Sequence, residues 1–249
     1  MSVRACVFVD GENFRRSIVQ LFESFRREDY LPKAANWASL FDWLVAQAAL
    51  GGERIRTYWY VTQSIDFWPY DFPNVMKEGD KLHRLLAIHT PYKEELDNLS
   101  NAQHRVIRMG QIVQEMENRR EKMAKCFDGW IKVQNGIATR DDAVEFRRAG
   151  STWYDLFRES MGQEKAVGVK MAVDLITLRD NYEVAVIVSG DQDYVPAVQV
   201  IKDLGKRVIN VAFETRDGQL LPGGARRLNQ LADRGLTVSY KDLGKYLGL

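Results

Sequence analysis

The chain has 249 residues, and its 35 Lys and Arg residues nearly balance its 34 Asp and Glu residues, which leaves a formal charge of +1. This balance excludes a nucleic-acid binder that works through a basic tail. Apolar residues make up 45% of the chain and charged residues 28%. That composition is typical of a globular protein and excludes intrinsic disorder.

Cysteine spacing and hydropathy indicate the cellular compartment in which we expect the protein. Cys6 and Cys126 lie far apart and form no Cys-x-x-Cys spacing, which argues against a disulfide framework and a zinc ribbon. The first residues carry no secretion signal, and no apolar stretch approaches the roughly 18 residues of a membrane-spanning helix. We therefore expect a cytoplasmic protein without membrane attachment.

The amino-terminal part alternates strands and helices. The apolar run from Ala5 to Val9 stops at Asp-Gly-Glu-Asn and predicts a parallel strand buried on both faces. Apolar spacing predicts helices from Phe14 to Arg27 and from Trp37 to Leu50, and Arg54 to Val61 is the next predicted strand. This order is typical of an α/β sheet.

The regular order breaks between about residues 62 and 142. This segment contains an aromatic loop and several helical stretches, of which the longest runs from Ala102 to Val133. Its charges are mixed, so we predict a solvent-exposed helical insertion rather than a nucleic-acid arm. A short strand, Ala143 to Arg147, is predicted after it.

The last third of the chain restores the pattern. The helix predicted from Val169 to Leu178 is apolar nearly all round, and Val184 to Val188 predicts another buried strand. The elements predicted after it are a helix, a strand, a helix and an edge strand, at Tyr194 to Leu204, Arg207 to Phe213, Ala225 to Ala232 and Leu236 to Tyr240. We predict one α/β domain over residues 1–249, with a mostly parallel sheet of about five strands and helices on both faces, plus the helical insertion.

Three carboxylates follow the buried strands. Asp10 and Asp191 come directly after two of them, and Asp193 lies two residues further on. Ligands bind at this edge of a parallel sheet, and carboxylates brought together there repel unless a cation neutralises them. Oxygen ligands without Cys or His favour Mg²⁺ or Mn²⁺, which suits phosphoryl transfer. Any one Asp after a strand, taken alone, is more often a helix cap or an Asx turn, but Asp10 and Asp191 together, each after a buried strand, favour the shared site.

Three motifs resemble the NYN domain, a branch of the PIN-like ribonucleases. They are VFVDGENF near the start, EKAVGVKMAVDL before the fourth strand, and VIVSGDQDYVPAV, which begins in that strand and continues past its end. The resemblance implies a mostly parallel sheet and acids that bind divalent cations and activate water to cut RNA. Asp10 and Asp191 then become metal ligands and Asp193 a ligand or a neighbouring acid, while Asn13 and Ser189 line the site.

One position departs from the family motif. Gly168 stands where the motif expects Asp, so one carboxylate of the usual set is missing. Asp174 matches another acidic position of the family and is a further catalytic candidate. Six residues turn a helix by about 600°, so Asp174 lies on a different face from position 168.

Basic and aromatic residues are candidates for holding the substrate. The predicted RNA-binding cations form three pairs, Arg15 and Arg16, Arg147 and Arg148, and Lys165 and Lys170. Aromatic residues after the second and third strands either stack on bases or form the core of the insertion. They are Phe67, Trp68, Tyr70, Phe72, Trp153, Tyr154 and Phe157.

The sequence thus leads to a metal-dependent endoribonuclease, with Mg²⁺ or Mn²⁺ at the acids and single-stranded or structured RNA as substrate. DNA is not excluded, because acids on a metal do not recognise the 2′-hydroxyl. The alternative is a catalytically reduced RNA-binding or scaffold module, motivated by Gly168. A small-molecule phosphatase is a third hypothesis, and the insertion is a candidate surface for forming homo-oligomers.

Overall fold

The sheet is larger than the sequence indicated. The computed structural model describes residues 2–25, 30–223 and 225–249. Within them, eight strands form one sheet in the order β4-β3-β2-β1-β5-β6-β7, with β8 also paired to β6. Five neighbouring strands, β2, β1, β5, β6 and β8, run parallel. The predicted α/β class with a mostly parallel sheet is therefore confirmed.

The strand count of about five was too low, and two of the predicted strands are longer than expected. The strands β4 (Ser160–Met161) and β7 (Leu220–Leu221) have two residues each, too short to produce a periodic pattern. The strands β2 (Gly52–Trp68) and β3 (Val144–Asp155) run well past their predicted ends. The remaining strands are β1 (Val3–Asp10), β5 (Val184–Val188), β6 (Arg207–Glu214) and β8 (Arg234–Ser239).

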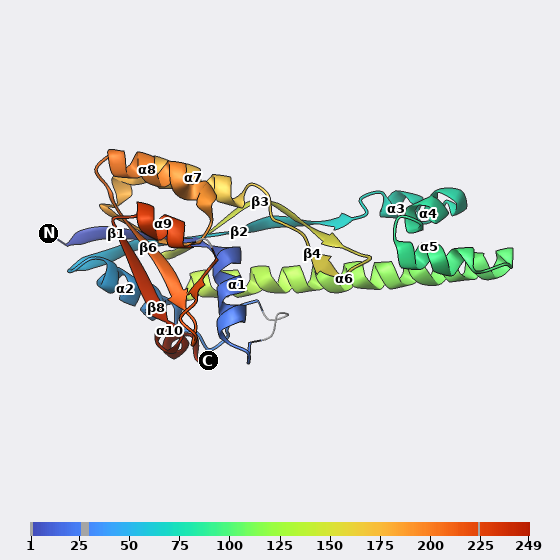
Figure 1. The fold of residues 1–249 in the computed structure, drawn as a ribbon, viewed down its shortest axis with the longest axis horizontal. Coiled ribbons are helices and arrows are strands. Elements are labelled where there is room, and N and C mark those ends of the chain that lie inside the picture. The colour runs from blue at the N-terminus through green and yellow to red at the C-terminus, as the bar shows by residue number, and fades with distance from the viewer. Residues whose placement is uncertain (1, 26–29, 224) are drawn as a thin grey trace. The chain divides into compact units, whose positions relative to one another are not determined.

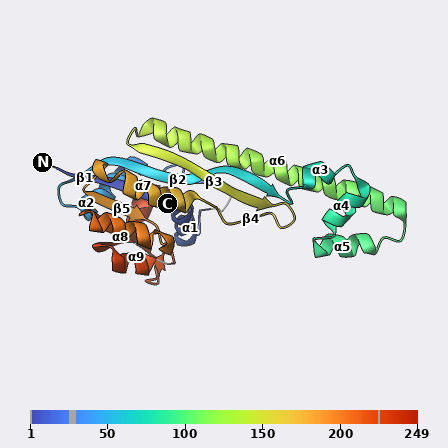
Figure 2. The same ribbon diagram turned by 90° about the horizontal axis from the view of Figure 1, so that it is seen from above.

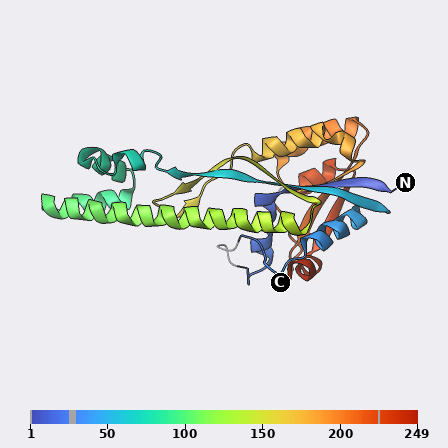
Figure 3. The same ribbon diagram turned by 180° about the vertical axis from the view of Figure 1, so that it is seen from behind.

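Helices cover both faces of the parallel part of the sheet (Figures 1 and 3). One face packs against α1 (Gly11–Leu21), α2 (Trp37–Ala48) and α10 (Tyr240–Leu247). The other packs against α7 (Val167–Thr177), α8 (Val195–Asp203) and α9 (Ala225–Leu231). Side chains alternate along β1, so Val7 and Val9 enter the first core, and Cys6 and Phe8 enter the second.

Helix boundaries differ most from the predictions at α1 and at the long helix from Ala102, which continues to Arg140 past its predicted end at Val133. Asp10 is the N-cap of α1 and Leu21 its last residue, whereas the predicted helix continued to Arg27. Residues 26–29, with that predicted end, lie outside the described residues. Two single-turn 3₁₀ helices, Arg179–Asn181 and Gln192–Tyr194, flank β5.

The chain divides into two compact units. The first takes residues 1–62, 130–149 and 166–249, and the second takes 63–129 and 150–165. β2, α6 (Ala102–Arg140) and β3 each contribute residues to both units. The second unit also contains α3 (Phe72–Val75), α4 (Gly79–Leu86) and α5 (Thr90–Asp97), beside the first half of α6 (Figure 2). It therefore holds strand residues as well as the expected helices.

Within the second unit, Arg119 bonds to the segment that follows β3. Its guanidinium donates to the carbonyl oxygens of Leu156 and Phe157, at 2.9 and 3.3 Å, and its Nε pairs with Glu159 at 3.1 Å. The His89 ring stacks on Phe157 with 5.0 Å between the ring centroids. None of the helices in the described parts of the chain has the length and apolarity of a membrane-spanning segment.

Candidate functional site

The site begins with Asp10 at the carboxyl end of β1. β1 pairs in parallel with β5, with Val9 opposite Val188, so the residues that follow the two strands meet at one edge. Asp10 is 1% exposed. Within the described residues its carboxylate accepts four hydrogen bonds. Oδ1 accepts from the backbone N–H of Asn13 at 3.1 Å, and Oδ2 from the Asn13 amide at 2.7 Å and from the Ser189 and Tyr194 hydroxyls at 3.0 Å each.

The buried Ser189 hydroxyl links the acids that follow the two strands. It donates to Asp10 Oδ2 at 3.0 Å and accepts from the backbone N–H of Asp191 at 3.1 Å. Asp191 Oδ1 in turn accepts from the backbone N–H of Asp193 at 2.9 Å. Three of the acids expected at the site are thus connected by a short chain of hydrogen bonds.

Burial changes the proton affinity of Asp10. Burial raises the pKa of this carboxyl above its usual value, and the hydrogen bonds from Asn13, Ser189 and Tyr194 oppose that rise. A buried carboxylate is stabilised either by such donors or by a cation.

The donor chemistry at this edge suits a hard divalent cation. The candidate ligands are carboxylate, hydroxyl and amide oxygens, which Mg²⁺ and Mn²⁺ prefer. In the part of the chain that the structure describes, no group of three or more His, Cys, Asp or Glu is arranged to hold a metal. Mg²⁺ requires only one or two carboxylates beside water and phosphate. The residues present therefore fit an ion held by fewer carboxylates than the sequence led us to expect.

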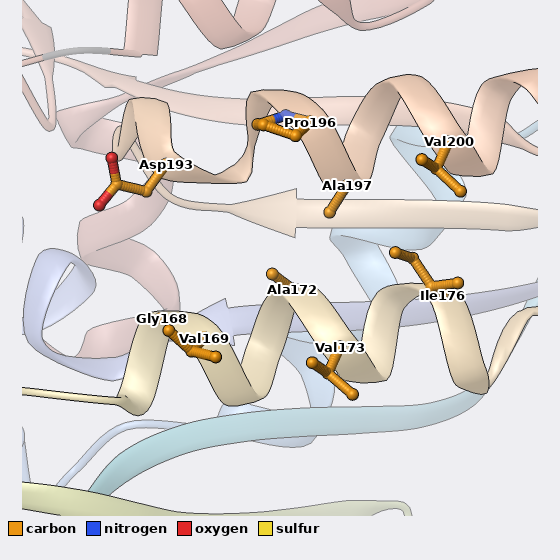
Figure 4. A pocket seen from close by; sticks show the side chains of 9 residues that line it. All are labelled: Gly168, Val169, Ala172, Val173, Ile176, Asp193, Pro196, Ala197 and Val200. Atoms are coloured by element: carbon orange, nitrogen blue, oxygen red, sulfur yellow. The ribbon is translucent and has the colours of Figure 1, made fainter.

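Position 168 faces the same carboxylate network. Gly168 is the second residue of α7, and a Cβ built there would lie 3.4 Å from the Tyr194 hydroxyl. It lines one end of an apolar groove of about 320 Å³ between α7 and α8, with Asp193 at the same end (Figure 4). The Cβ of a side chain at position 168 would thus lie in contact with the hydroxyl that bonds to Asp10.

Asp174 belongs to a different cluster. It lies six residues further along α7, about 9 Å along the helix axis, and is 3% exposed. Its carboxylate accepts from Arg147 at 2.6 Å, Lys170 at 2.9 Å and the Tyr60 hydroxyl at 3.1 Å. Burial alone would raise the Asp174 pKa, but the bonds from Lys170 and Arg147 outweigh it and hold the pKa below its usual value.

Most of the predicted RNA-binding cations have acidic or polar partners. Glu12 pairs with Arg15 at 3.2 Å and with Arg16 at 2.9 Å, while Arg147 and Lys170 pair with Asp174. Arg148 donates to Gln134 and Asn135. Arg16 keeps 60% of its side chain exposed, and Lys165, in the second unit, is exposed. RNA binding by these residues stays a prediction.

The aromatic candidates fall within the second unit, where several form its core. Phe72, Tyr154 and Phe157 are buried, and Trp68 packs edge-on against Phe157. Tyr70 is 59% exposed. The interpretation as core of the insertion holds for these buried rings.

Two residues of the site were missed at the level of sequence. Tyr194 counted only as the aromatic residue of the motif, yet its hydroxyl contacts Asp10. Arg227 donates to the Gln192 side chain at 2.8 Å, between the two acids of the Ser-Gly-Asp-Gln-Asp turn. The Arg226-Arg227 pair was the available signal, but only the fold brings it beside that turn.

Glycine at position 190 is required by close packing. A Cβ there would lie 2.7 Å from Cγ of Pro222 and 2.9 Å from its carbonyl oxygen. The turn that carries Asp191 and Asp193 therefore rests directly on the segment after β7.

Comparison with known proteins agrees with the motifs. The family described as NYN domain matches residues 95–222, just over half of the chain, a range that includes α7 and β5 but not Asp10. A protein of unknown function from Vibrio parahaemolyticus has a similar structure, with 12% identity, a TM-score of 0.44, and 95% of this chain and 93% of that chain covered. No curated protein matches significantly. On the family match, the chain belongs to the NYN domain family of PIN-like, nuclease-like proteins.

Proposed function

We propose that the chain is a metal-dependent endoribonuclease that hydrolyses RNA phosphodiester bonds at the edge formed by the ends of β1 and β5. The observation that carries this proposal is the Ser189 hydroxyl, which joins Asp10 to the backbone of Asp191. It supports a site in which acids from two neighbouring strands act together. Membership of a nuclease-like family supports the same reaction class.

The proposed ligands of Mg²⁺ or Mn²⁺ are one or two of the three acids Asp10, Asp191 and Asp193. A divalent cation held there supplies Lewis acidity for water activation and neutralises charge on the scissile phosphate. Asn13, Ser189 and Tyr194 fix the orientation of the Asp10 carboxylate through their hydrogen bonds. This prior orientation removes the reorganisation that a mobile carboxylate would need.

The substrate proposal is RNA, in line with the family. Arg227 lies beside the acid-bearing turn through its bond to Gln192 and is exposed, so it is a candidate for binding a phosphate near the scissile bond. We also propose a cytoplasmic location, because Cys6 and Cys126 are both free thiols and thiols persist in reducing compartments.

A catalytically reduced RNA-binding module is the second candidate. It is favoured by Gly168 and by the 1% exposure of Asp10, whose Oδ2 is occupied by three donors. Such a module would keep RNA affinity without cleavage. The two candidates therefore differ in whether the protein cleaves the RNA that it binds.

The test is cleavage of a labelled single-stranded RNA with Mn²⁺, compared with binding of the same RNA in EDTA. Asp10→Asn and Asp191→Asn should each abolish cleavage, whereas Asp217→Asn, at an exposed acid remote in sequence from both strand ends, should not. Cleavage that survives in both site variants would refute the proposed site. RNA binding without any cleavage by the parent protein would favour the second candidate.

A further inference from the structure

The carboxyl ends of β6 and β8 lie at the same edge of the sheet as Asp10 and Asp191, because β1, β5, β6 and β8 pair in parallel. We propose that exposed cations along this edge bind the phosphates of the RNA strand beside the scissile bond. In order from the acid-bearing turn, this cation track consists of Arg227, Arg226, Arg216 and Lys241. The inference rests on the proposed function, which supplies RNA as the ligand, but it requires neither cleavage nor a metal ion.

The sheet brings together the two segments that carry Arg216 and Lys241. Glu214, the last residue of β6, pairs with Ser239, the last residue of β8, and each cation follows two residues beyond its strand. The Arg216 guanidinium lies 5.0 Å from the ring centroid of Tyr240, the residue before Lys241, and this contact orients the cation. Both cations are thus held beyond the carboxyl ends of parallel strands, where such sheets bind their ligands.

Two adjacent grooves lead along this edge from the acid-bearing turn. The first, of about 410 Å³, is lined by Arg226 and by Pro222, on which the turn rests. The second, of about 760 Å³, is lined by Arg216 and Lys241. Gln219 lines both grooves, so they meet at the connection between β6 and β7. An extended strand that leaves the turn can therefore follow a hollowed surface toward α10.

The cations of the track keep their charge for a ligand. Among the described residues, the ion pairs include none of Arg216, Arg226 and Lys241, and all three are exposed. Several RNA-binding cations predicted from sequence instead pair with acids, as Arg147 does with Asp174. A carboxylate competes with a phosphate for the same cation, so we expect RNA phosphates to bind the track first.

Two acids in the second groove give the inference a prediction of opposite sign. Glu23 and Asp217 line this groove beside three cations, of which Lys245 already pairs with Asp242 at 2.8 Å. A phosphate bound there is repelled by both acids. Removing a cation of the track should therefore weaken RNA binding, whereas Asp217→Asn should strengthen it.

The test is binding of a fluorescein-labelled oligouridine in EDTA, followed by fluorescence anisotropy over a series of salt concentrations. For a single strand, each phosphate contact adds about 0.7 to the magnitude of the slope of log K against log salt. Arg216→Gln combined with Lys241→Gln should weaken binding at low salt and reduce that magnitude by about 1.4. Arg226→Gln alone should reduce it by about 0.7.

Arg4→Gln combined with Arg207→Gln provides the matched control. Both arginines are exposed and lie at the starts of β1 and β6, so they occupy the opposite, amino-terminal edge of the same sheet. This variant removes the same charge from the chain and should keep the affinity and the salt dependence of the parent. Urea unfolding of each variant checks that the fold is retained.

The outcomes separate the inference from the proposed function. RNA binding by the Arg216 and Lys241 double variant that equals binding by the parent would overturn the track and leave the proposed function in place. An equal loss in the control variant would also overturn the track, because the effect would then follow from net charge. Absence of RNA binding by the parent protein would count against the proposed function and against RNA as the ligand of the track.

Discussion

The substitution Asp174→Asn should destabilise the fold at neutral pH by about 2–4 kcal/mol. The shape of the side chain is kept, but the charge that pairs with Arg147 at 2.6 Å and Lys170 at 2.9 Å is lost. A hydrogen bond to a charged group contributes about 1.5–3 kcal/mol. Lys170 keeps 43% of its side chain exposed, so most of the loss is expected from the Arg147 contact.

The pH dependence of the stability difference between parent and variant provides a second, independent test of this prediction. The pKa of Asp174 is lowered in the folded protein, so its stabilising effect is complete above the unfolded value of about 3.9. The effect is lost as the pH falls through the folded pKa. The difference between parent and variant should therefore be constant near neutral pH and shrink below about pH 4.

Urea unfolding followed by circular dichroism at several pH values measures both effects. Asp180→Asn is the control, because Asp180 is 85% exposed and its loss should change stability by less than about 0.5 kcal/mol. A difference that is absent at neutral pH, or that does not shrink in acid, would refute the reasoning. A catalytic role for Asp174 stays a prediction. It would be supported if Asp174→Asn loses more RNA cleavage than the unfolded fraction of that variant explains.

Three further predictions concern packing and buried charge. Gly190→Ala should destabilise the fold by about 1–3 kcal/mol, because its Cβ meets Pro222 at 2.7 Å. Gly136→Ala, in the interior of α6 with its nearest contact at 3.7 Å, should instead stabilise by up to about 1 kcal/mol. Equal signs for these two in urea unfolding would contradict the packing argument. Arg54→Met should destabilise the fold by about 3–5 kcal/mol, because the Asp141 carboxylate, 10% exposed and 2.8 Å from the guanidinium, loses its cation. Unchanged stability on thermal unfolding would show that the pair is solvated.

The sheet edge was predictable from sequence because its strands have a simple pattern. The strand from Val184 to Val188 was predicted with its observed ends, since a short, wholly apolar run between polar turns has few other interpretations. From the parallel arrangement it followed that Asp10 and the residues after Val188 lie at one edge, and the Ser189 contacts agree.

The contacts that cross between elements could not be predicted. Lys170 and Asp174 lie one turn apart on α7, a spacing that the sequence shows, but Arg147, which also pairs with Asp174, comes from β3. The Tyr194 hydroxyl was hidden because hydrophobic pattern treats the whole residue as one aromatic position. Such contacts depend on the distance between side chains from separate elements, and periodicity carries no information on that distance.

The division of the chain into interleaved pieces affects how the protein can fold during synthesis. Asp10 and Ser189 touch although they are 179 positions apart, so β1 must wait for β5 to leave the ribosome. The second unit ends at residue 165, before the last piece of the first unit begins at residue 166. It can therefore be complete while the nuclease-like sheet still lacks β5, β6 and β8. Until those strands arrive, the edge of β1 that later pairs with β5 remains open to incorrect pairing.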